Sequence, residues 1–399
     1  MELLAPCGTF EKLKTAIHFG ADAVYFAGKK FGLRAFAGNF DEKQMKEAVE
    51  FVHKHGKKVY ITVNIVAHNG DFDGLGDYLK FLYEIGVDAV IVSDIGIIEH
   101  IKKYAPNLEF HISTQANITN KFVAKFFADL GAKRIVLARE LSLKEIKEIR
   151  DYLPKDVELE AFVHGAMCIS YSGRCLLSNF LTGRDGNRGA CVQACRWEYS
   201  ICEKSRKGDG FEIQEDERGT YILNSKDLNM INHLKDLEEA GVYSLKIEGR
   251  MKSAYYVANI INAYRRALNL LKEGKEIPEE LYNETFKSSH RNYTTGFYFG
   301  RTNSECLETS MPVQTHEFMA VVLEDQENGK VLIEQRNRFA VGEELEVLSP
   351  NETFNQRFVV GQMTNLKGEE VLDAKNVQEK LVLETNVNLK KGDILRKRI

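Results

Sequence analysis

The sequence lacks long apolar runs and contains little proline. No stretch of about 18 apolar residues occurs, which argues against a membrane-spanning helix. Only 6 of the 399 residues are proline and 30 are glycine, which excludes collagen-like and low-complexity proteins. The opening residues, MELLAPCGTFEKLK, lack a basic segment followed by an apolar one, so we expect no secretory signal, no membrane partner and a cytoplasmic location. In a reducing compartment the 7 cysteines favour thiolates or metal ligands over disulfides.

Charge of one sign does not dominate the chain. The net charge of −4 excludes a protein that is basic over its whole surface. A local basic patch would still be compatible with nucleic-acid binding, because a patch is enough to create an electrostatic footprint. The charge balance therefore leaves RNA or DNA open as a partner.

One pattern repeats from residue 1 to about 270: a short apolar run, a polar turn and an amphipathic segment that ends near glycine. The apolar runs are rich in Val and Ile, as expected for parallel strands buried on both faces. We expect strands within 1–6, 21–28, 57–67, 87–94, 108–116, 133–140, 157–165 and 242–250. Eight such units predict an α/β fold, a (β/α)8 TIM-like barrel. A doubly wound sheet is the alternative, but the first run ends in APCGTF without a G-x-G-x-x-G motif.

The periodicity changes toward the C-terminus. We interpret residues 271–315 as a connector and 316–399 as a small all-β, barrel-like domain. Its closely spaced apolar runs are separated by turns such as ENGK and KKGD, which favour hairpins. The expected domains are therefore a barrel over 1–270 with a cysteine-rich insertion at about 164–220, the connector and the β-domain.

Four cysteines within the insertion are the strongest chemical signal. Cys168, Cys175, Cys191 and Cys195 follow the spacing C-x6-C-x15-C-x3-C. Buried, inert thiols are the alternative, but four cysteines in a Gly- and Arg-rich stretch favour ligation of a metal or cluster. Only the last pair has the short spacing typical of structural zinc, whereas an iron–sulfur cluster accepts four thiolates from varied loops. A 4Fe-4S cluster is our first expectation and zinc on the same cysteines the second.

Barrel geometry predicts where an active site lies. Catalytic residues of such barrels sit at the carboxyl ends of the strands. The polar residues expected there are Cys7, Asn64, Asp94, Thr114, Gln115, Arg139, Glu140, His164, Lys246, Glu248 and Arg250. Each alone has a structural explanation, such as a helix cap or an ion pair. Their convergence on one mouth, beside the cysteine-rich insertion, indicates a site.

Long motifs resemble one known family. ELEAFVHGAMCISYSGRCLLSNFLTGR, at 158–184, looks like the signature of the collagenase-like peptidases of family U32. Further matching segments are APCG at 5–8, GADAVYFAG at 20–28, STQANITN at 113–120, LARELSL at 137–143 and KIEGRMKSAYYVA at 246–258. The resemblance covers nearly the whole chain.

The resemblance implies more than the family name. Better-understood branches are oxygen-independent hydroxylation proteins that carry a four-iron cluster on four cysteines. The length, the β-domain and SSHRNYTTGFY at 288–298 are most similar to the branch that makes 5-hydroxyuridine at the tRNA wobble position. That branch implies prephenate as the hydroxyl donor. Hydroxylation of another RNA, such as ribosomal RNA, and collagenase-like proteolysis are the alternatives.

The sequence itself favours hydroxylation over proteolysis. Neither G-x-S-x-G nor H-E-x-x-H occurs, and a Cys168–His164 pair would conflict with a cysteine committed to a cluster. A non-catalytic RNA-binding or scaffold protein is a third hypothesis. A homo-oligomer and a partner subunit of the same family are both left open.

These expectations assign roles to the candidate residues. A small anionic hydroxyl donor would be bound by Asn64, Gln115, Arg139, Arg174, Lys246 and Arg250. Proton transfer is assigned to Glu140, His164 and Glu248. The tRNA would contact Arg184, Arg188, Arg291 and Arg301. The aromatics of 286–301 are explained either by base stacking or by packing in the protein, and the basic end Arg396–Arg398 either by RNA contact or by solvation.

Overall fold

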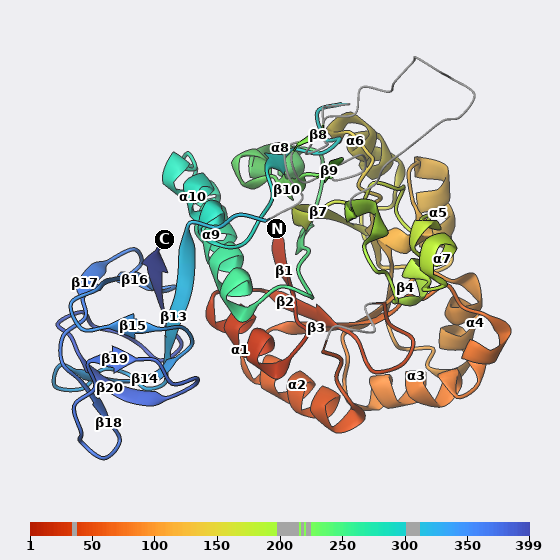
Figure 1. Ribbon diagram of the computed structural model, residues 1–399. Coiled ribbons are helices and arrows are strands. Elements are labelled where there is room, and N and C mark those ends of the chain that lie inside the picture. Colours follow the sequence, from red (N-terminus) through yellow and green to blue (C-terminus); the bar gives the residue numbers. More distant parts are fainter. Residues whose placement is uncertain (34–37, 198–214, 217–218, 221–224, 301–311) are drawn as a thin grey trace. The chain divides into compact units, whose positions relative to one another are not determined.

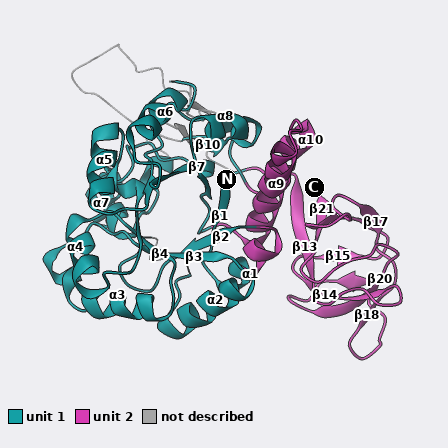
Figure 2. Ribbon diagram, turned by 180° about the vertical axis from the view of Figure 1, so that it is seen from behind, with its two compact units in different colours: residues 1–13, 21–251, 290–312 teal, residues 14–20, 252–289, 313–399 magenta. Residues whose placement is uncertain are grey.

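The computed structural model describes residues 1–33, 38–197, 215–216, 219–220, 225–300 and 312–399. Candidate Arg301 lies outside these residues. The chain forms two compact units (Figure 2). Residues 1–13, 21–251 and 290–312 form the barrel unit, and residues 14–20, 252–289 and 313–399 form the C-terminal unit.

This division differs from the boundary expected near residue 270. Helix α9 (Ala254–Lys272) belongs to the C-terminal unit, whereas residues 290–312 of the expected connector belong to the barrel unit. The side chains of α9 explain its grouping, because Asn259 and Asn262 donate hydrogen bonds to the carbonyl oxygens of Glu284 and Ser349. Periodicity along the chain identifies the helix but does not say which unit it joins.

Eight parallel strands close into a barrel (Figure 1), as predicted. They are β1 (Glu2–Pro6), β2 (Ala23–Phe26), β3 (Lys58–Val63), β4 (Ala89–Val92), β5 (Phe110–Ile112), β6 (Arg134–Val136), β7 (Glu158–Ala166) and β11 (Ser244–Ile247). Each strand pairs with the next, and β11 pairs with both β1 and β7. Seven of these strands lie within their expected apolar runs and β7 extends one residue beyond its run, so the prediction of a TIM-like barrel is confirmed.

Helices surround these strands (Figure 1). They are α2 (Glu42–Lys54), α3 (Leu75–Glu84), α4 (Ile95–Tyr104), α5 (Lys121–Asp129), α6 (Leu143–Tyr152) and α8 (Leu234–Glu239), while α1 (Phe10–His18) contributes residues to both units. Local sequence explains where they begin: Ser142 caps α6 and exchanges hydrogen bonds with Glu145, and Asp94 caps α4.

Beyond Glu160, β7 is no longer paired with β6 and gains a different neighbour on that side. β6 pairs with β7 only over Glu158–Glu160, and β10 (Asp227–Asn229) then pairs antiparallel with β7 from His164 to Ala166. A short strand, β12 (Tyr293–Thr294), adds to β10. The wall between β6 and β7 therefore opens toward its carboxyl end, where the cysteine-rich insertion begins.

The interior of the barrel contains a buried charged cluster. Arg134 contacts Glu2 at 2.6 Å and Glu160 at 3.1 Å, and the ammonium group of Lys246 lies 2.6 Å from Glu160. Tyr60 donates a hydrogen bond to Glu2 at 2.8 Å. Burial alone would raise the pKa of Glu160, but the charges of Lys246 and Arg134 outweigh it and hold that pKa below its usual range. Ionised groups are kept inside the barrel because they are paired there.

The C-terminal unit combines α9, α10 (Glu279–Glu284) and the 3-10 turn η6 (Thr285–Lys287) with an antiparallel sheet. The sheet has the order β17 (Arg357–Val359), β16 (Glu344–Leu348), β21 (Ile394–Arg398), β13 (His316–Val322), β14 (Lys330–Gln335), β20 (Lys380–Glu384) and β18 (Met363–Asn365). A smaller pair consists of β15 (Phe339–Ala340) and β19 (Asp373–Ala374). The predicted all-β domain is confirmed, and ENGK forms the β13–β14 turn with positive φ at Asn328 and Gly329.

One expectation for this part of the chain needs correction. Arg396 is neither solvated nor available to RNA: it is completely buried and contacts Glu346 at 2.7 Å. Its neighbour Lys397 pairs with Glu343 at 2.7 Å. A buried guanidinium requires such partners.

No helix within the described residues has the length and apolar character needed to cross a bilayer.

Candidate active site at the carboxyl ends of the barrel strands

The loops after β3 and β5 are joined at the mouth of the barrel. The Asn64 amide donates a hydrogen bond to the Ser113 hydroxyl at 3.0 Å, and Ser113 accepts another from the main-chain N–H of Gln115. Asn64 is 7% exposed, whereas Gln115 is half-buried. Asn64 therefore holds the mouth together, and Gln115 keeps access to solvent.

The loop after β6 supplies a cation and a carboxylate. Arg139 donates to the Ala166 carbonyl at 3.0 Å and stacks over Phe162, with 5.3 Å between the guanidinium carbon and the ring centre. Its Nε is buried without a hydrogen-bond partner among the described residues. Glu140 accepts hydrogen bonds from the main-chain N–H and the hydroxyl of Ser172. Arg139 thus has unused donor capacity, while Glu140 is engaged by the cysteine-rich insertion.

Two cations expected at the mouth are largely used by the protein. Lys246 is 4% exposed and paired with Glu160 inside the barrel. Arg250 is 3% exposed and donates to the Leu33 carbonyl at 2.8 Å and to the Asn39 side chain at 2.7 Å. Their positions near the end of β11 agree with the sequence pattern, but their contacts are those of residues that hold the barrel and its loops.

His164 lies where β7 has β10 on one side and β11 on the other, and it is 1% exposed. It pairs through the main chain with both Ile247 and Asn229. Its Nε2 lies 3.4 Å from the hydroxyl of Tyr293, and the Tyr293 ring stacks on His290 with 4.8 Å between ring centres. A hydroxyl beside a ring nitrogen can fix the tautomer of an imidazole or relay its proton.

Glu248 follows β11 and is partly exposed. Its carboxylate lies 3.5 Å from the hydroxyl of Tyr25, which also donates to the Ile247 carbonyl at 2.9 Å. Glu248 therefore has the access to solvent that a residue transferring protons needs.

Residues 168–197, here called the cysteine segment, are fastened across the barrel mouth. Arg188 makes a two-pronged ion pair with Asp71, at 2.6 and 3.0 Å, and this lowers the pKa of Asp71 to about 2. Gly173 has φ +72° and packs on the loop after β5, where an added Cβ would lie 2.2 Å from the Gln115 carbonyl oxygen. The segment contains α7 (Leu177–Thr182) and the 3-10 turns η3 (Gly186–Arg188) and η4 (Ala194–Arg196). It is therefore an ordered cover attached to several strand ends.

All four cysteines of the segment are partly buried and none forms a disulfide. Burial raises the pKa of Cys195, and the charges of Cys168, Cys191 and Cys175 raise it further against the opposing effect of Arg196. Each of the three thiols is therefore near enough to affect Cys195 electrostatically.

The donor chemistry of these thiols fits a four-thiolate centre. Cys191 also accepts a hydrogen bond from the main-chain N–H of Gln193, with 3.3 Å between nitrogen and sulfur. Such bonds to sulfur tune iron–sulfur clusters. In the described part of the chain, no three His, Cys, Asp or Glu side chains stand at metal-binding spacing. Closing a site around a metal would therefore require the thiols to move closer together.

Cys7 differs from the cysteines of the segment. It is fully buried at the end of β1, and this burial raises the pKa of its thiol far above the usual range despite the charges of Lys12 and Arg250. The Lys12 ammonium group donates to the Arg250 carbonyl at 3.1 Å. Cys7 is thus a neutral thiol in the barrel wall rather than a thiolate at the mouth.

The predicted RNA contacts fall into different environments. Arg174 and Arg184 are exposed. Arg188 is paired with Asp71, and Arg291 is 3.2 Å from Asp227 and mostly buried. The two exposed arginines have the character expected of a surface for a polyanion, whereas the two paired ones stabilise the fold.

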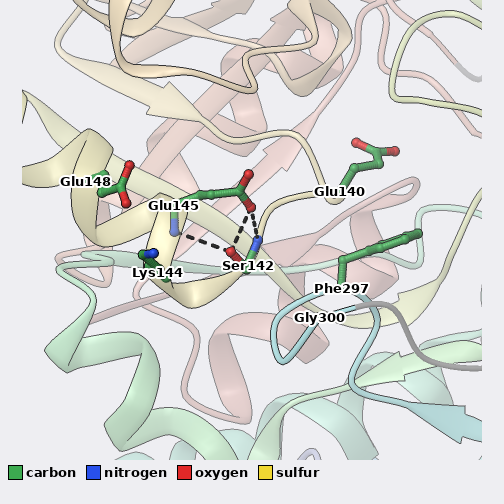
Figure 3. A pocket seen from close by; sticks show the side chains of 7 residues that line it. All are labelled: Glu140, Ser142, Lys144, Glu145, Glu148, Phe297 and Gly300. Carbon is green, nitrogen blue, oxygen red and sulfur yellow. Dashed lines mark hydrogen bonds between the residues drawn. The ribbon is translucent and has the colours of Figure 1, made fainter.

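A pocket of about 420 Å³ lies beside the mouth (Figure 3). It is lined by Glu140, Ser142, Lys144, Glu145, Glu148, Phe297 and Gly300. Glu145 exchanges hydrogen bonds with Ser142, and three carboxylates give the pocket an acidic lining. Such a lining does not suit an anionic donor.

Sequence reasoning missed the residues that hold the candidates in place. Asp71 and Ser172 gave no separate signal as site residues, because their partners lie far away in the sequence. Tyr293 was considered only among the aromatics of 286–301, for stacking or packing, and not as a partner of His164. Glu160 had one indication: a carboxylate within a buried strand needs a cation.

Comparison with known proteins adds the family. Residues 8–308 match the model of Peptidase family U32, and residues 314–396 match the Peptidase family U32 C-terminal domain. tRNA hydroxylation protein P1 of Bacillus subtilis is 42% identical over 355 residues, which cover 88% of this chain and 83% of the relative. tRNA hydroxylation protein P of Escherichia coli is 37% identical over 410 residues, covering 92% and 90%. The 23S rRNA 5-hydroxycytidine C2501 synthase of Escherichia coli is 41% identical over 273 residues, covering 68% of this chain and 40% of that protein. The chain therefore belongs to peptidase family U32.

Proposed function

We propose that this protein is an enzyme that hydroxylates tRNA, converting the wobble uridine to 5-hydroxyuridine without molecular oxygen. The observation that carries the proposal is the similarity along most of the chain to proteins named for tRNA hydroxylation. The barrel mouth supports it, because thiols, a cation with unused donor capacity and two residues able to transfer protons occur there together. The cytoplasmic location is part of this proposal, since the substrate is tRNA.

The chemistry favours a redox-active centre on the four cysteines. Replacing a C–H bond of a base by C–OH removes two electrons from that base. The hydroxyl donor is their acceptor, because it gains the displaced hydrogen and is reduced when its own C–OH bond breaks, and a redox-active centre can pass the electrons between the two. Zinc has no redox chemistry, so a 4Fe-4S cluster on Cys168, Cys175, Cys191 and Cys195 is the better proposal. When bound, such a cluster would supply a redox and Lewis-acid centre beside the mouth. The chain itself contributes four thiols held between ordered turns.

The hydroxyl donor would be a small anion, with prephenate as the compound implied by the resemblance. Arg139 and Arg174 suit its carboxylates, because a guanidinium binds a carboxylate through two parallel hydrogen bonds. Arg139 has a buried Nε without a partner among the described residues, and Arg174 is exposed. Lys246 and Arg250 are buried in the barrel wall, so their proposed role is to add positive electrostatic potential at the donor site rather than to contact the donor directly.

Two residues suit the transfer of protons. Glu248 is partly exposed beside the Tyr25 hydroxyl, and His164 lies beside the Tyr293 hydroxyl. Glu140, engaged by Ser172, is proposed to position the cysteine segment instead. A target base would have to leave its RNA stack to reach these groups, and bases in single-stranded loops do so at low cost.

Hydroxylation of ribosomal RNA is the second candidate. The observation that favours it is the 41% identity to a 23S rRNA 5-hydroxycytidine synthase over 273 residues. Proteolysis gains less support, because neither G-x-S-x-G nor H-E-x-x-H occurs in the sequence and Cys168 is assigned to the proposed cluster.

Nucleoside mass spectrometry of a deletion strain tests these functions directly. We expect loss of 5-hydroxyuridine and its derivatives from tRNA, with recovery on expression of the intact chain and no recovery with Cys168→Ala. Loss of a hydroxylated nucleoside from ribosomal RNA alone would support the second candidate. Unchanged nucleosides in both RNAs would refute hydroxylation.

A further inference from the structure

The cysteine segment presents large apolar side chains to solvent. Tyr171 is 59% exposed, Phe180 is 81% exposed and Trp197 is 43% exposed, and Leu176 and Leu181 are exposed as well. Phe180 lies on α7 and Trp197 directly follows η4, which packs against α7. Large aromatic side chains are normally buried, so several exposed ones in one short segment indicate a surface that another molecule covers.

The charge of the segment indicates which kind of molecule this is. Residues 168–197 contain four arginines, one aspartate, and no lysine or glutamate, in a chain whose net charge is −4. Arg174 and Arg184 are exposed, and they follow Tyr171 and Phe180 closely in the sequence. Arginine binds phosphate through its planar donors and stacks on flat rings, so this composition suits a polyanion with exposed bases.

A second exposed aromatic group on the barrel unit provides a contrast. Phe122 on α5 is 65% exposed and Tyr152 on α6 is 45% exposed, and the ammonium group of Lys121 lies over both rings. The flanking charges there nearly cancel, because the two helices carry five cations and four carboxylates, and Lys125 pairs with Asp129 on the same helix. The excess of positive charge beside the exposed aromatics is therefore larger on the cysteine segment, which has four arginines and one aspartate.

We propose that Tyr171, Phe180 and Trp197, with Arg174 and Arg184, form a face that binds an unpaired RNA loop by base stacking and phosphate contact. This inference rests on the proposed function and deepens it by naming the surface that receives the substrate. The segment is fastened to the strand ends through Arg188 and Ser172, so a loop bound there is held beside the candidate active site. Residues 286–301, the stretch where sequence suggested RNA contact, suit this role less, because Arg291 is paired and Tyr298 is buried.

Binding of two labelled RNAs to the intact protein tests the face. One is an anticodon stem–loop with uridine at the wobble position, and the other is a duplex of equal length without a loop. Phe180→Ala and Trp197→Ala should each weaken stem–loop binding by about 5- to 150-fold, the fold-change for loss of one stacked base, and should change duplex binding little. Arg184→Ala should weaken both RNAs and reduce the salt dependence of binding. Phe122→Ala is the matched control, because it removes a ring whose 65% exposure lies between those of Trp197 and Phe180, and it should leave both affinities unchanged.

The single tryptophan provides an independent measurement. Trp197 is the only tryptophan in the chain, so its fluorescence reports on this face without a label. Saturating stem–loop RNA should quench the emission and reduce its accessibility to acrylamide, whereas the duplex should do neither. Emission that does not change at saturation would overturn the stacking proposal.

The outcomes separate this proposal from the proposed function. If Phe180→Ala with Trp197→Ala restores hydroxylated tRNA in a deletion strain and binds the stem–loop as the control does, the face is refuted while the function stands. If the double variant keeps RNA binding but loses self-association in sedimentation, the face is a protein interface and the proposal is wrong. If the unaltered protein neither binds the stem–loop nor restores the nucleoside, the proposed function is refuted, and the RNA-binding face that rests on it is refuted as well.

Discussion

Replacing Lys246 by methionine tests whether the lysine serves the barrel or the substrate. In the structure the ammonium group is 4% exposed and lies 2.6 Å from a carboxylate of Glu160, which is completely buried. The change removes one of the two cations that keep Glu160 ionised, and Arg134 remains at 3.1 Å. Removing one partner of a buried ion pair costs about 3–5 kcal/mol. Because Arg134 still compensates, we expect a loss of about 3 kcal/mol in the free energy of unfolding at pH 7.

The pH dependence identifies the cause. In the unaltered protein the pKa of Glu160 lies below its ordinary value of 4.5, so its ionised form adds stability above that pH and the gain is lost as the pH falls through the lowered pKa. In Lys246→Met burial is less compensated and the pKa of Glu160 rises. The variant is then penalised most at neutral pH, and the penalty shrinks as acid protonates Glu160.

Urea denaturation at several pH values measures both effects. The double variant Lys246→Met with Glu160→Gln should recover most of the lost stability, because it buries no uncompensated carboxylate. A loss below about 1 kcal/mol at pH 7, or one independent of pH, would refute the reasoning, since breaking a buried pair costs more. If the stable double variant also hydroxylates RNA normally, Lys246 does not bind the donor directly.

Three further predictions concern the cysteines and two ion pairs. From the proposed cluster we expect anaerobically purified protein to contain iron and to be brown. Cys168→Ser should remove both, whereas Cys7→Ser should retain both, and equal iron content of the two variants by elemental analysis would contradict this. Arg188→Ala should make the cysteine segment more sensitive to limited proteolysis than the same segment is in the unaltered protein. Because the pKa of Asp71 is about 2, the ion pair should protect the segment of the unaltered protein down to about pH 4. Equal proteolysis of the two proteins would disprove that Arg188 fastens the segment. Arg396→Met should lower the unfolding free energy by about 3 kcal/mol, because the buried carboxylates of Glu284 and Glu346 lose one cation and keep Lys287 as a shared partner. Unchanged thermal unfolding would contradict this expectation.

The barrel could be predicted from the sequence because its strands carry a local signal. Runs rich in Val and Ile alternate with helices that begin at capping residues such as Ser142, and neither feature depends on distant contacts. The positions of Arg139, His164 and Glu248 followed in turn, because the fold places the ends of parallel strands at one mouth.

The partners of these residues could not be predicted. Arg188 and Asp71 are separated by 117 positions, and nothing in either neighbourhood indicates the other. Lys246 was expected to bind the donor at the barrel mouth and Arg396 to be solvated or to contact RNA, yet both are buried against carboxylates from other elements. Sequence patterns give the location of a charged side chain along an element, whereas its pairing depends on the register and packing of segments far apart.

The divergence of β7 from β6 separates two tasks within one molecule. The closed strands supply a scaffold whose strand pairing involves none of the residues 168–197, and β10 then returns to pair with β7 on the side that β6 has left. Members of a family built this way can exchange the intervening stretch and so acquire a different target while keeping the same cylinder. A chimaera that carries residues 168–226 of a ribosomal RNA-directed relative should therefore fold normally and change which RNA it selects.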